Sequence, residues 1–325
     1  MSKLCIIDPA CQVPGLKFLF PGADYYAHEP SSFFHFNHFS NEEHYSHYNF
    51  YYRTDWETIT EKNYNELLLV APLKDFSKGL TQSVTDHLKN MRNLITNIIE
   101  RCNFKTVALF DVYDYDYDPS EINTFWKVDY YFKRNYQRTK IYKENVFPFP
   151  YIMFVRPCIL NMCLTKTKSN YTINRAFWCG GLYNHIDHVS CVYRNREKIH
   201  REISGLIDTV PTTSYEKYLS IMRSYKIGVD LLGVGDPNKR TIELLTNGVL
   251  TMSMCKDLEW GFEDGDAFHS DTFFSTADEF KEKLARLLTD DDHYLTCLQQ
   301  QYYIVDKYFN KEWLRNYIVK HAGLA

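Results

Sequence analysis

Residues 226–254 read KIGVDLLGVGDPNKRTIELLTNGVLTMSM, and this stretch has the pattern of a strand, a polar loop, a short helix and a second strand. The first apolar run, 227–232, leads into Gly-Val-Gly-Asp-Pro, and the second, 249–252, follows Asn247-Gly248. Short apolar runs bounded by turn residues are typical of buried strands. The stretch therefore predicts a strand-helix-strand unit with a helix of barely two turns.

The expected helix carries positive charge at its start. Lys239 and Arg240 lie in its first turn, beside free backbone N–H groups that already favour an anion, so phosphate is the natural ligand. Glu243 follows within one turn of both basic residues, and a carboxylate there can accept both hydroxyls of a ribose. An ordinary strand-helix-strand unit with a basic first turn is the alternative that this spacing leaves open.

Further segments follow this unit in a fixed order. They are Phe-Glu-Asp-Gly at 262–265, an expected strand around Phe273-Phe274, a helix opening at 276–280, and Tyr-Phe-Asn at 308–310 before a final helix. Upstream, Phe-Trp-Cys-Gly-Gly at 177–181 precedes Arg194 and Arg196. Together with Lys-Arg-Thr-Ile-Glu-Leu at 239–244, this order resembles the nucleotide-sugar half of GT-B glycosyltransferases.

The resemblance implies an α/β protein of two Rossmann-like domains that face each other across a cleft. It assigns residues 1–155 to acceptor binding and residues 156–325 to the nucleotide sugar, with a C-terminal helix that can cross back to the first domain. In these enzymes basic side chains bind the donor diphosphate, an acidic side chain binds the ribose, and nearby loops select the base and the sugar. The corresponding loop in this chain is expected at 205–215. The corresponding residues here are Arg194, Arg196, Lys239 and Arg240 for the diphosphate, Glu243 for the ribose, and Tyr215, Asp236 and Asn238 for weaker donor contacts.

Composition agrees with a soluble globular enzyme. The 325 residues allow two domains of ordinary size, with 45% hydrophobic and 24% charged residues. A net charge of −4, with no basic patch, argues against a nucleic-acid partner. No signal peptide or membrane span is expected. The nine cysteines form no CxxC pair, so we expect reduced core thiols, a cytosolic location, no zinc site and no cofactor.

The first half of the chain alternates between strands and a helix. Short strands are expected at 4–7, 16–20, 67–72, 107–111 and 129–134, and a long amphipathic helix at 81–102. Such alternation predicts a parallel sheet covered on both faces. Pro148, Pro150 and Pro157 then mark the crossing between domains.

An aspartate-rich segment follows the apolar run at 107–110. Ligands of open α/β sheets lie beyond the carboxyl ends of the strands, so Asp111 and Asp114 are candidates for the general base that deprotonates an acceptor hydroxyl. Capping or solvating a turn is the alternative role. With Asp-Tyr-Tyr-Phe-Lys-Arg at 129–134, the segment loosely resembles the acceptor half of exostosin-like and spore-coat-type enzymes of bacteria and large DNA viruses. Weaker acceptor-binding candidates are Asp24, Lys133 and Arg134.

Five histidines at positions 28–47 raise the question of a metal site. Their spacing fits neither a helix nor a hairpin, and the segment is typical of a loop that contacts the acceptor. Asp114-Tyr-Asp116 has the letters of a DxD motif but lies in the half that is not expected to bind the diphosphate. We therefore predict no bound metal.

The stereochemistry is predicted from a missing residue. Many retaining GT-B enzymes carry two glutamates separated by seven positions, and the partner of Glu243 would be Gly235. Its absence favours inversion by one in-line displacement, in which the helix start and basic residues stabilise the leaving nucleoside diphosphate. The expected donor is a UDP- or GDP-sugar, with UDP-xylose as one option, and the acceptor is a glycan or glycoprotein. The sequence predicts no oligomeric state.

Two other functions remain open. A sugar-nucleotide epimerase of the same architecture needs an acid/base pair, for which Asp111 with His185 or His188 could serve. A non-catalytic carbohydrate- or nucleotide-binding module would keep the fold without the chemistry.

Overall fold

The computed structural model describes residues 4–9, 13, 15–26, 50–51, 59–70, 82–111, 126–148, 171–180, 190–211, 213–232, 239–263 and 265–324. The chain divides into two compact units. Unit 1 comprises Met1–Tyr136, Lys140–Pro157 and Leu314–Ala325, and unit 2 comprises Gln137–Thr139 and Cys158–Trp313. The division along the chain falls between Pro157 and Cys158, and the last twelve residues belong with unit 1.

Unit 1 is built on a seven-stranded sheet in the order β3-β2-β1-β4-β5-β6-β7. Every described pairing in it is parallel. The strands are β1 (Leu4–Ile7), β2 (Asp24–Tyr26), β3 (Phe50–Tyr51), β4 (Glu66–Val70), β5 (Thr106–Asp111), β6 (Tyr130–Lys133) and β7 (Val146–Pro148), and the helices are α1 (Gly15–Leu19), α2 (Gln82–Arg101) and α9 (Lys311–His321).

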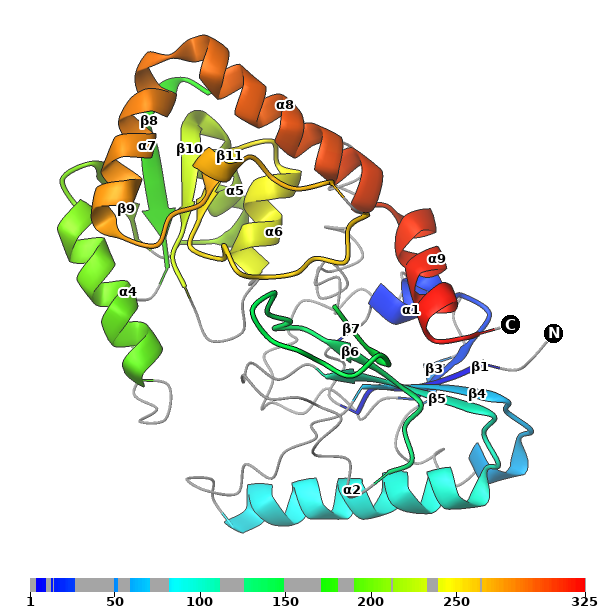
Figure 1. Ribbon diagram of the computed structural model, residues 1–325. Helices are drawn as coiled ribbons and strands as arrows, with labels where there is room; N and C mark the ends of the chain where they lie inside the picture. Colours follow the sequence, from blue (N-terminus) through cyan, green and yellow to red (C-terminus); the bar gives the residue numbers. More distant parts are fainter. Residues whose placement is uncertain are drawn as a thin grey trace. The chain divides into compact units, whose positions relative to one another are not determined.

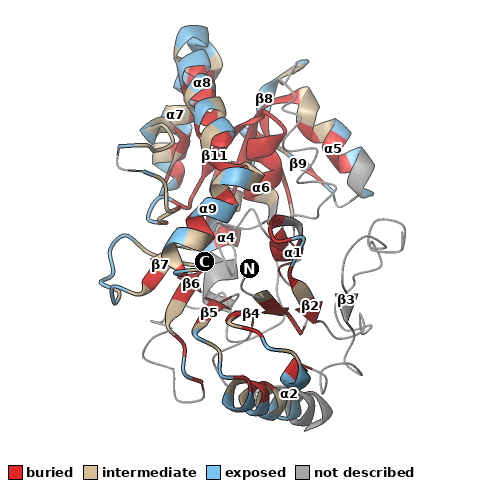
Figure 2. Cartoon of the chain, turned by 90° about the vertical axis from the view of Figure 1, so that its right-hand side faces the viewer, coloured by how far each residue is buried: buried red, intermediate tan, exposed pale blue. Residues whose placement is uncertain are grey.

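Helices cover both faces of this sheet. On one face lies α2 (Figure 1), whose Ile95 and Ile98 belong to the same apolar cluster as Leu67 of β4 and Val107 of β5. Successive strand residues point to opposite faces, so Phe132 lies on the other side, where its ring is 6.2 Å from that of Tyr317 in α9. Burial on both faces explains why β4 and β5 are apolar without alternation, as Figure 2 shows by their buried colour.

Unit 2 is built on a four-stranded parallel sheet in the order β11-β10-β8-β9. Its elements are β8 (Ile173–Cys179), α4 (Ser190–Ile203), β9 (Ile207–Val210), α5 (Tyr215–Ser224), β10 (Tyr225–Asp230), α6 (Lys239–Thr246), β11 (Leu250–Ser253), the 3-10 helix η6 (Ser270–Thr272), α7 (Ala277–Thr289) and α8 (Asp291–Tyr308).

Two apolar clusters hold this second sheet between helices. Ala176 and Trp178 of β8 pack in the cluster that contains residues of α4, α7 and α8. The alternate residues, Phe177 and Cys179, pack with residues of α5 and with Leu244 of α6. Alternation along one strand thus sends α4 to one face of the sheet and α5 and α6 to the other.

Two glycines fix α6 in this arrangement. Gly228 lies in β10, and a Cβ there would collide with the Leu244 side chain, so its small size permits close helix-sheet packing. Gly248 has φ +73° and follows the last turn of α6, where Val249 N donates to Leu244 O at 3.2 Å. A glycine in the left-handed backbone conformation commonly ends a helix. The turn into β11 is therefore encoded by the local sequence.

Most sequence-predicted elements are confirmed, and three are wrong. Residues 16–20 form no strand, because α1 occupies Gly15–Leu19 and the apolar residues Leu16, Leu19 and Phe20 have helical spacing. The strand expected at Phe273-Phe274 is an isolated parallel bridge to Ser253 that follows η6. The expected loop at 205–215 contains β9.

Among the described residues, no helix has both the length and the apolar character that a membrane span requires.

Candidate functional site

The strand order of unit 2 predicts a ligand-binding site at the carboxyl ends of β8 and β10. The chain leaves β8 through α4 to β9 on one side, and returns through α5 to β10 on the other. Connections therefore diverge from the carboxyl ends of these two strands, which is the topological switch point where open α/β sheets bind ligands. Helix α6 begins just after β10, so its N-terminus belongs to the same edge.

A buried carboxylate fixes the start of α6 to the sheet. Asp230 ends β10 and is fully buried. Its Oδ2 accepts hydrogen bonds from Thr241 Oγ1 at 2.6 Å and from Ser253 Oγ at 3.1 Å. Thr241 is in the first turn of α6, and Ser253 ends β11. These contacts hold three elements together where the free N–H groups of the helix begin.

Arg240 extends from that first turn to the end of β8. Its guanidinium carbon lies 5.6 Å from the ring centroid of Trp178, within the range of a cation–π contact. A Cβ at Gly180 would collide with Arg240 Nη2. The absence of a side chain at position 180 therefore leaves the space that the guanidinium occupies, and a positive charge lies at the switch point.

Glu243 lies one turn further along α6 and is buried, with 4% of its surface exposed. Burial raises the pKa of the Tyr218 hydroxyl, and the negative charge of Glu243 raises it further, while Arg240 lowers it. Burial also raises the pKa of the Cys179 thiol, with the same opposing effects of Arg240 and Glu243. The structure thus brings Arg240 and Glu243 together around the end of β8.

The structure also brings one of the two predicted arginines of α4 to this edge. Arg196 is buried, and its Nε donates to the carbonyl oxygen of Leu232 at 2.6 Å, two residues after the end of β10. Arg194 lies in α4, and Lys239 is the first residue of α6. Both residues therefore belong to helices that contribute to this site. Tyr215 begins α5. Asp236 and Asn238 lie outside the described residues.

In unit 1, Asp111 is the last residue of β5 and is fully buried. Its Oδ2 lies 3.3 Å from Nζ of Lys133, which ends β6 and is also fully buried. The parallel register aligns the two residues across neighbouring strands. Arg134 follows Lys133, and its backbone N–H donates to Asp111 O at 3.4 Å. Asp114 lies outside the described residues.

Asp24, the weaker acceptor candidate, begins β2 at the opposite end of its strand from the carboxyl edge. Its carboxylate lies 3.3 Å from Lys62 Nζ and accepts a hydrogen bond from the Tyr64 hydroxyl. The histidines at positions 28–47, as well as His185 and His188, lie outside the described residues.

Two buried aspartates at the carboxyl ends of strands were not predicted from the sequence. Asp230 follows an apolar run, as Asp111 does, so the same argument could have found it. Asp8 follows β1, is fully buried, and accepts hydrogen bonds from Tyr25 Oη at 2.6 Å and from the backbone N–H of Val13 at 2.7 Å. Asp8 could have been predicted in the same way, because it follows the apolar residues 4–7.

Comparison with known proteins finds one family model that matches part of the chain and several solved structures of similar fold. Residues 175–317 match the family model described as glycosyl transferase-like. No match is found among curated proteins. A structure of T4 phage BGT, a mutant in complex with UDP-glucose, is similar over 99% of both chains, with 9% identity and a TM-score of 0.51.

Two further solved structures have a similar fold. The DNA modifying enzyme beta-glucosyltransferase is 10% identical, with a TM-score of 0.54 over 99% of this chain and 100% of its own. The O-GlcNAc transferase of Thermobaculum terrenum, a mutant, is 9% identical, with a TM-score of 0.54 over 99% of this chain and 68% of its own. At this identity the likeness establishes the fold, and the predicted α/β class with two Rossmann-like units of the GT-B type is confirmed.

Proposed function

We propose that this chain, which has a GT-B fold and a glycosyl transferase-like match over residues 175–317, is a glycosyltransferase. It moves a sugar from a nucleoside-diphosphate donor to a hydroxyl group of a glycan, with inversion at the anomeric carbon. The observation that carries this proposal is the placement of Arg240. Its guanidinium lies beside the end of β8, in space that Gly180 leaves open, at the start of a helix. A diphosphate bound there would meet a side-chain cation and backbone N–H groups together.

The leaving nucleoside diphosphate is stabilised in this proposal by protein charges. Arg240 and Lys239 supply the charges of α6, and Arg194 and Arg196 those of α4. Positive groups that are already oriented toward developing negative charge lower the barrier without reorganisation. The reaction would then need no divalent metal at the diphosphate.

The nucleoside is recognised in this proposal by Glu243 at its ribose hydroxyls. Tyr215, Asp236 and Asn238 are proposed to make the weaker contacts with the base or the sugar. The structure of T4 phage BGT contains UDP-glucose, so UDP-sugars come first among the donors to be tested, followed by GDP-sugars. UDP-xylose is one of the options.

The general base is proposed to be one of the aspartates that end or follow β5. Asp111 is fully buried and paired with Lys133. The ion pair already engages this carboxylate, and full burial limits access by an acceptor. We therefore propose Asp114 as the base, with Asp111 and Lys133 positioning the strand end. Asp24 and Arg134 remain acceptor-binding candidates.

The proposed acceptor is a glycan or glycoprotein. DNA is the competing acceptor, since one protein of similar fold is a DNA modifying enzyme. A net charge of −4 argues against DNA, because phosphate neutralisation supplies most of the affinity for duplexes. A cytosolic location is part of the same proposal, and the five described cysteines are free and buried, as reduced thiols would be.

The test is product analysis with a labelled donor. A thermal-shift panel of nucleoside diphosphates selects the base, and the full chain is then incubated with the matching labelled sugar nucleotides, with oligosaccharides or duplex DNA as acceptor. A labelled oligosaccharide supports the proposal. Labelled DNA would show that the acceptor is DNA and not a glycan. An epimerised donor would favour the epimerase, and binding without turnover of any donor would favour a non-catalytic module.

A further inference from the structure

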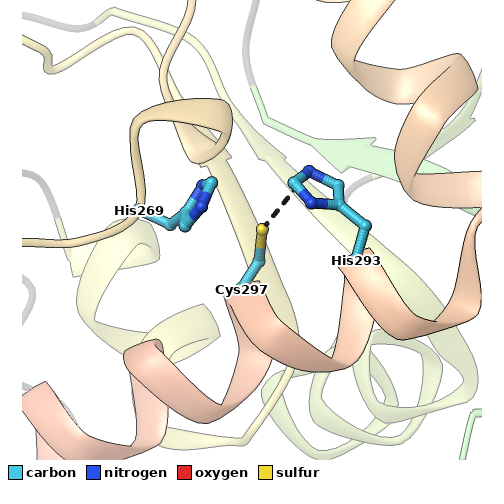
Figure 3. A group of neighbouring side chains, drawn as sticks. All are labelled: His269, His293 and Cys297. Carbon is cyan, nitrogen blue, oxygen red and sulfur yellow. Dashed lines mark hydrogen bonds between the residues drawn. The ribbon is translucent and has the colours of Figure 1, made fainter.

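A group of two histidines and one cysteine lies in unit 2, outside the proposed donor site (Figure 3). His293 and Cys297 are one turn apart on α8, and His269 directly precedes η6. Figure 3 shows the three side chains converging from these two segments. The mechanism proposed above uses none of them.

The ligand atoms of the three side chains are slightly further apart than in a formed metal site. One ligand atom from each lies within 4.8 Å of the others, and Cys297 Sγ is 3.8 Å from Nε2 of His293. For tetrahedral zinc, with Zn–N of about 2.0–2.1 Å and Zn–S of about 2.3 Å, two such ligands are about 3.5 Å apart. The observed separation is therefore near the final one, and small side-chain rotations would close the site.

A carboxylate stands at the same place. Asp271 Oδ2 lies 2.8 Å from Nε2 of His293 and 2.8 Å from Nη1 of Arg286. The Asp271 backbone N–H donates to Nδ1 of His269 at 3.1 Å. These contacts place an oxygen donor next to Nε2 of His293 and hold the Asp271 backbone against the ring of His269.

We propose that His269, His293 and Cys297 bind one Zn²⁺ ion, with an Asp271 oxygen as the fourth ligand. Thiolate and imidazole together suit zinc, whereas calcium and magnesium prefer sites made of oxygen atoms. Cys297 is fully buried, while both histidines keep part of their surface exposed. The ion enters from the imidazole side and is closed off by the thiol.

Binding of the ion changes the bonds that the cluster makes. The metal takes up one lone pair of each ring. It replaces the contacts of His293 Nε2 with Cys297 and Asp271 and the hydrogen bond of Asp271 N–H to His269. The proton that Nε2 of His293 shares with Asp271 moves to Nδ1 of the same ring. The Cys297 proton is released to solvent. Burial raises the pKa of that thiol to about 11, so the metal must stabilise the thiolate, as zinc does.

The ion would act as a structural clamp between η6 and α8. The 265–273 segment contains little regular structure apart from η6, and α8 is a long helix of the unit 2 core. Because the site exists only in the folded chain, the binding free energy of the ion adds to the stability of the fold. No zinc was expected from the sequence because the cysteines form no CxxC pair. The His-x-x-x-Cys spacing at 293–297 was the signal available in the sequence.

The experiment measures Zn²⁺ binding to the full chain after chelator treatment and dialysis. We expect one equivalent of zinc per chain, a raised thermal midpoint, and, with Co²⁺ as probe, the thiolate-to-cobalt charge-transfer absorption of a tetrahedral site. Cys297→Ser should abolish that absorption, and His293→Ala should weaken zinc binding by about 100-fold or more, because each ligand carries a large share of the affinity.

Controls separate this site from other thiols and from misfolding. Cys102→Ser removes a buried cysteine of unit 1, and His200→Ala removes a histidine of α4, so both should bind zinc as the wild type does. Nucleoside-diphosphate binding checks that Cys297→Ser and His293→Ala remain folded. The proposal is overturned if the wild type retains no zinc, or if both ligand variants bind it with unchanged affinity and leave the cobalt spectrum unaltered.

Discussion

Gly180→Ala changes the position of Arg240 without removing its charge. The added Cβ would collide with Nη2 of the guanidinium. Because the guanidinium is the end of a flexible side chain, it can move away while the backbone of β8 stays in place. The substitution therefore tests whether a diphosphate depends on the observed position of this group, whereas Arg240→Ala tests its presence.

The expected magnitudes follow from the contacts that would be lost. A hydrogen bond to a charged group contributes about 1.5–3 kcal/mol, which corresponds to about 10- to 150-fold in affinity. Arg240→Ala should weaken nucleoside-diphosphate binding by that factor, and Gly180→Ala by about tenfold, because the displaced cation keeps part of its attraction. The assay is calorimetric titration with UDP and GDP at fixed ionic strength.

Gly205→Ala is the matched control, since a Cβ there would meet no atom within 4 Å. It should leave both affinity and thermal midpoint unchanged. Unchanged affinity in Arg240→Ala would refute the donor site itself. If Arg240→Ala weakens binding and Gly180→Ala does not, the observed guanidinium position is not the binding one.

Three further outcomes are expected. Glu243→Ala should weaken nucleotide binding, and calorimetry should find that it no longer distinguishes 2′- or 3′-deoxyribose analogues; retained discrimination would exclude the ribose contact. Asp114→Asn should lower turnover by about 10²–10⁴-fold with donor affinity unchanged, and Asp111→Asn should mainly lower the unfolding midpoint; near-normal turnover in both variants would place the base elsewhere. Gly228→Ala should reduce the free energy of unfolding by about 1–3 kcal/mol, because its Cβ would strike Leu244, and urea titration showing no loss would contradict that packing.

The fold of unit 2 was predictable because local and long-range signals agree there. The apolar run that forms β10, the basic first turn of α6 and the Asn247-Gly248 turn each specify the same strand-helix-strand unit. The five-residue α1 was missed because an apolar run that short fits a strand as well as a helix. β7 was missed because a three-residue edge strand gives no periodicity.

Side-chain partners were less accessible to sequence reasoning than elements. The pairing of Asp111 with Lys133 arises from the register of β5 and β6, which no single-strand pattern contains. The approach of Arg240 to Gly180 joins residues sixty positions apart. Both contacts depend on strand order, so they become visible only once the sheet is assembled.

The most direct test of the central claim is the anomeric configuration of the product, followed by NMR from a donor of known configuration. We predict a new glycoside of inverted configuration, formed together with one nucleoside diphosphate and at a rate that Arg240→Ala reduces. A product of retained configuration would contradict the single displacement, and a donor that is epimerised without transfer would contradict the glycosyltransferase mechanism itself.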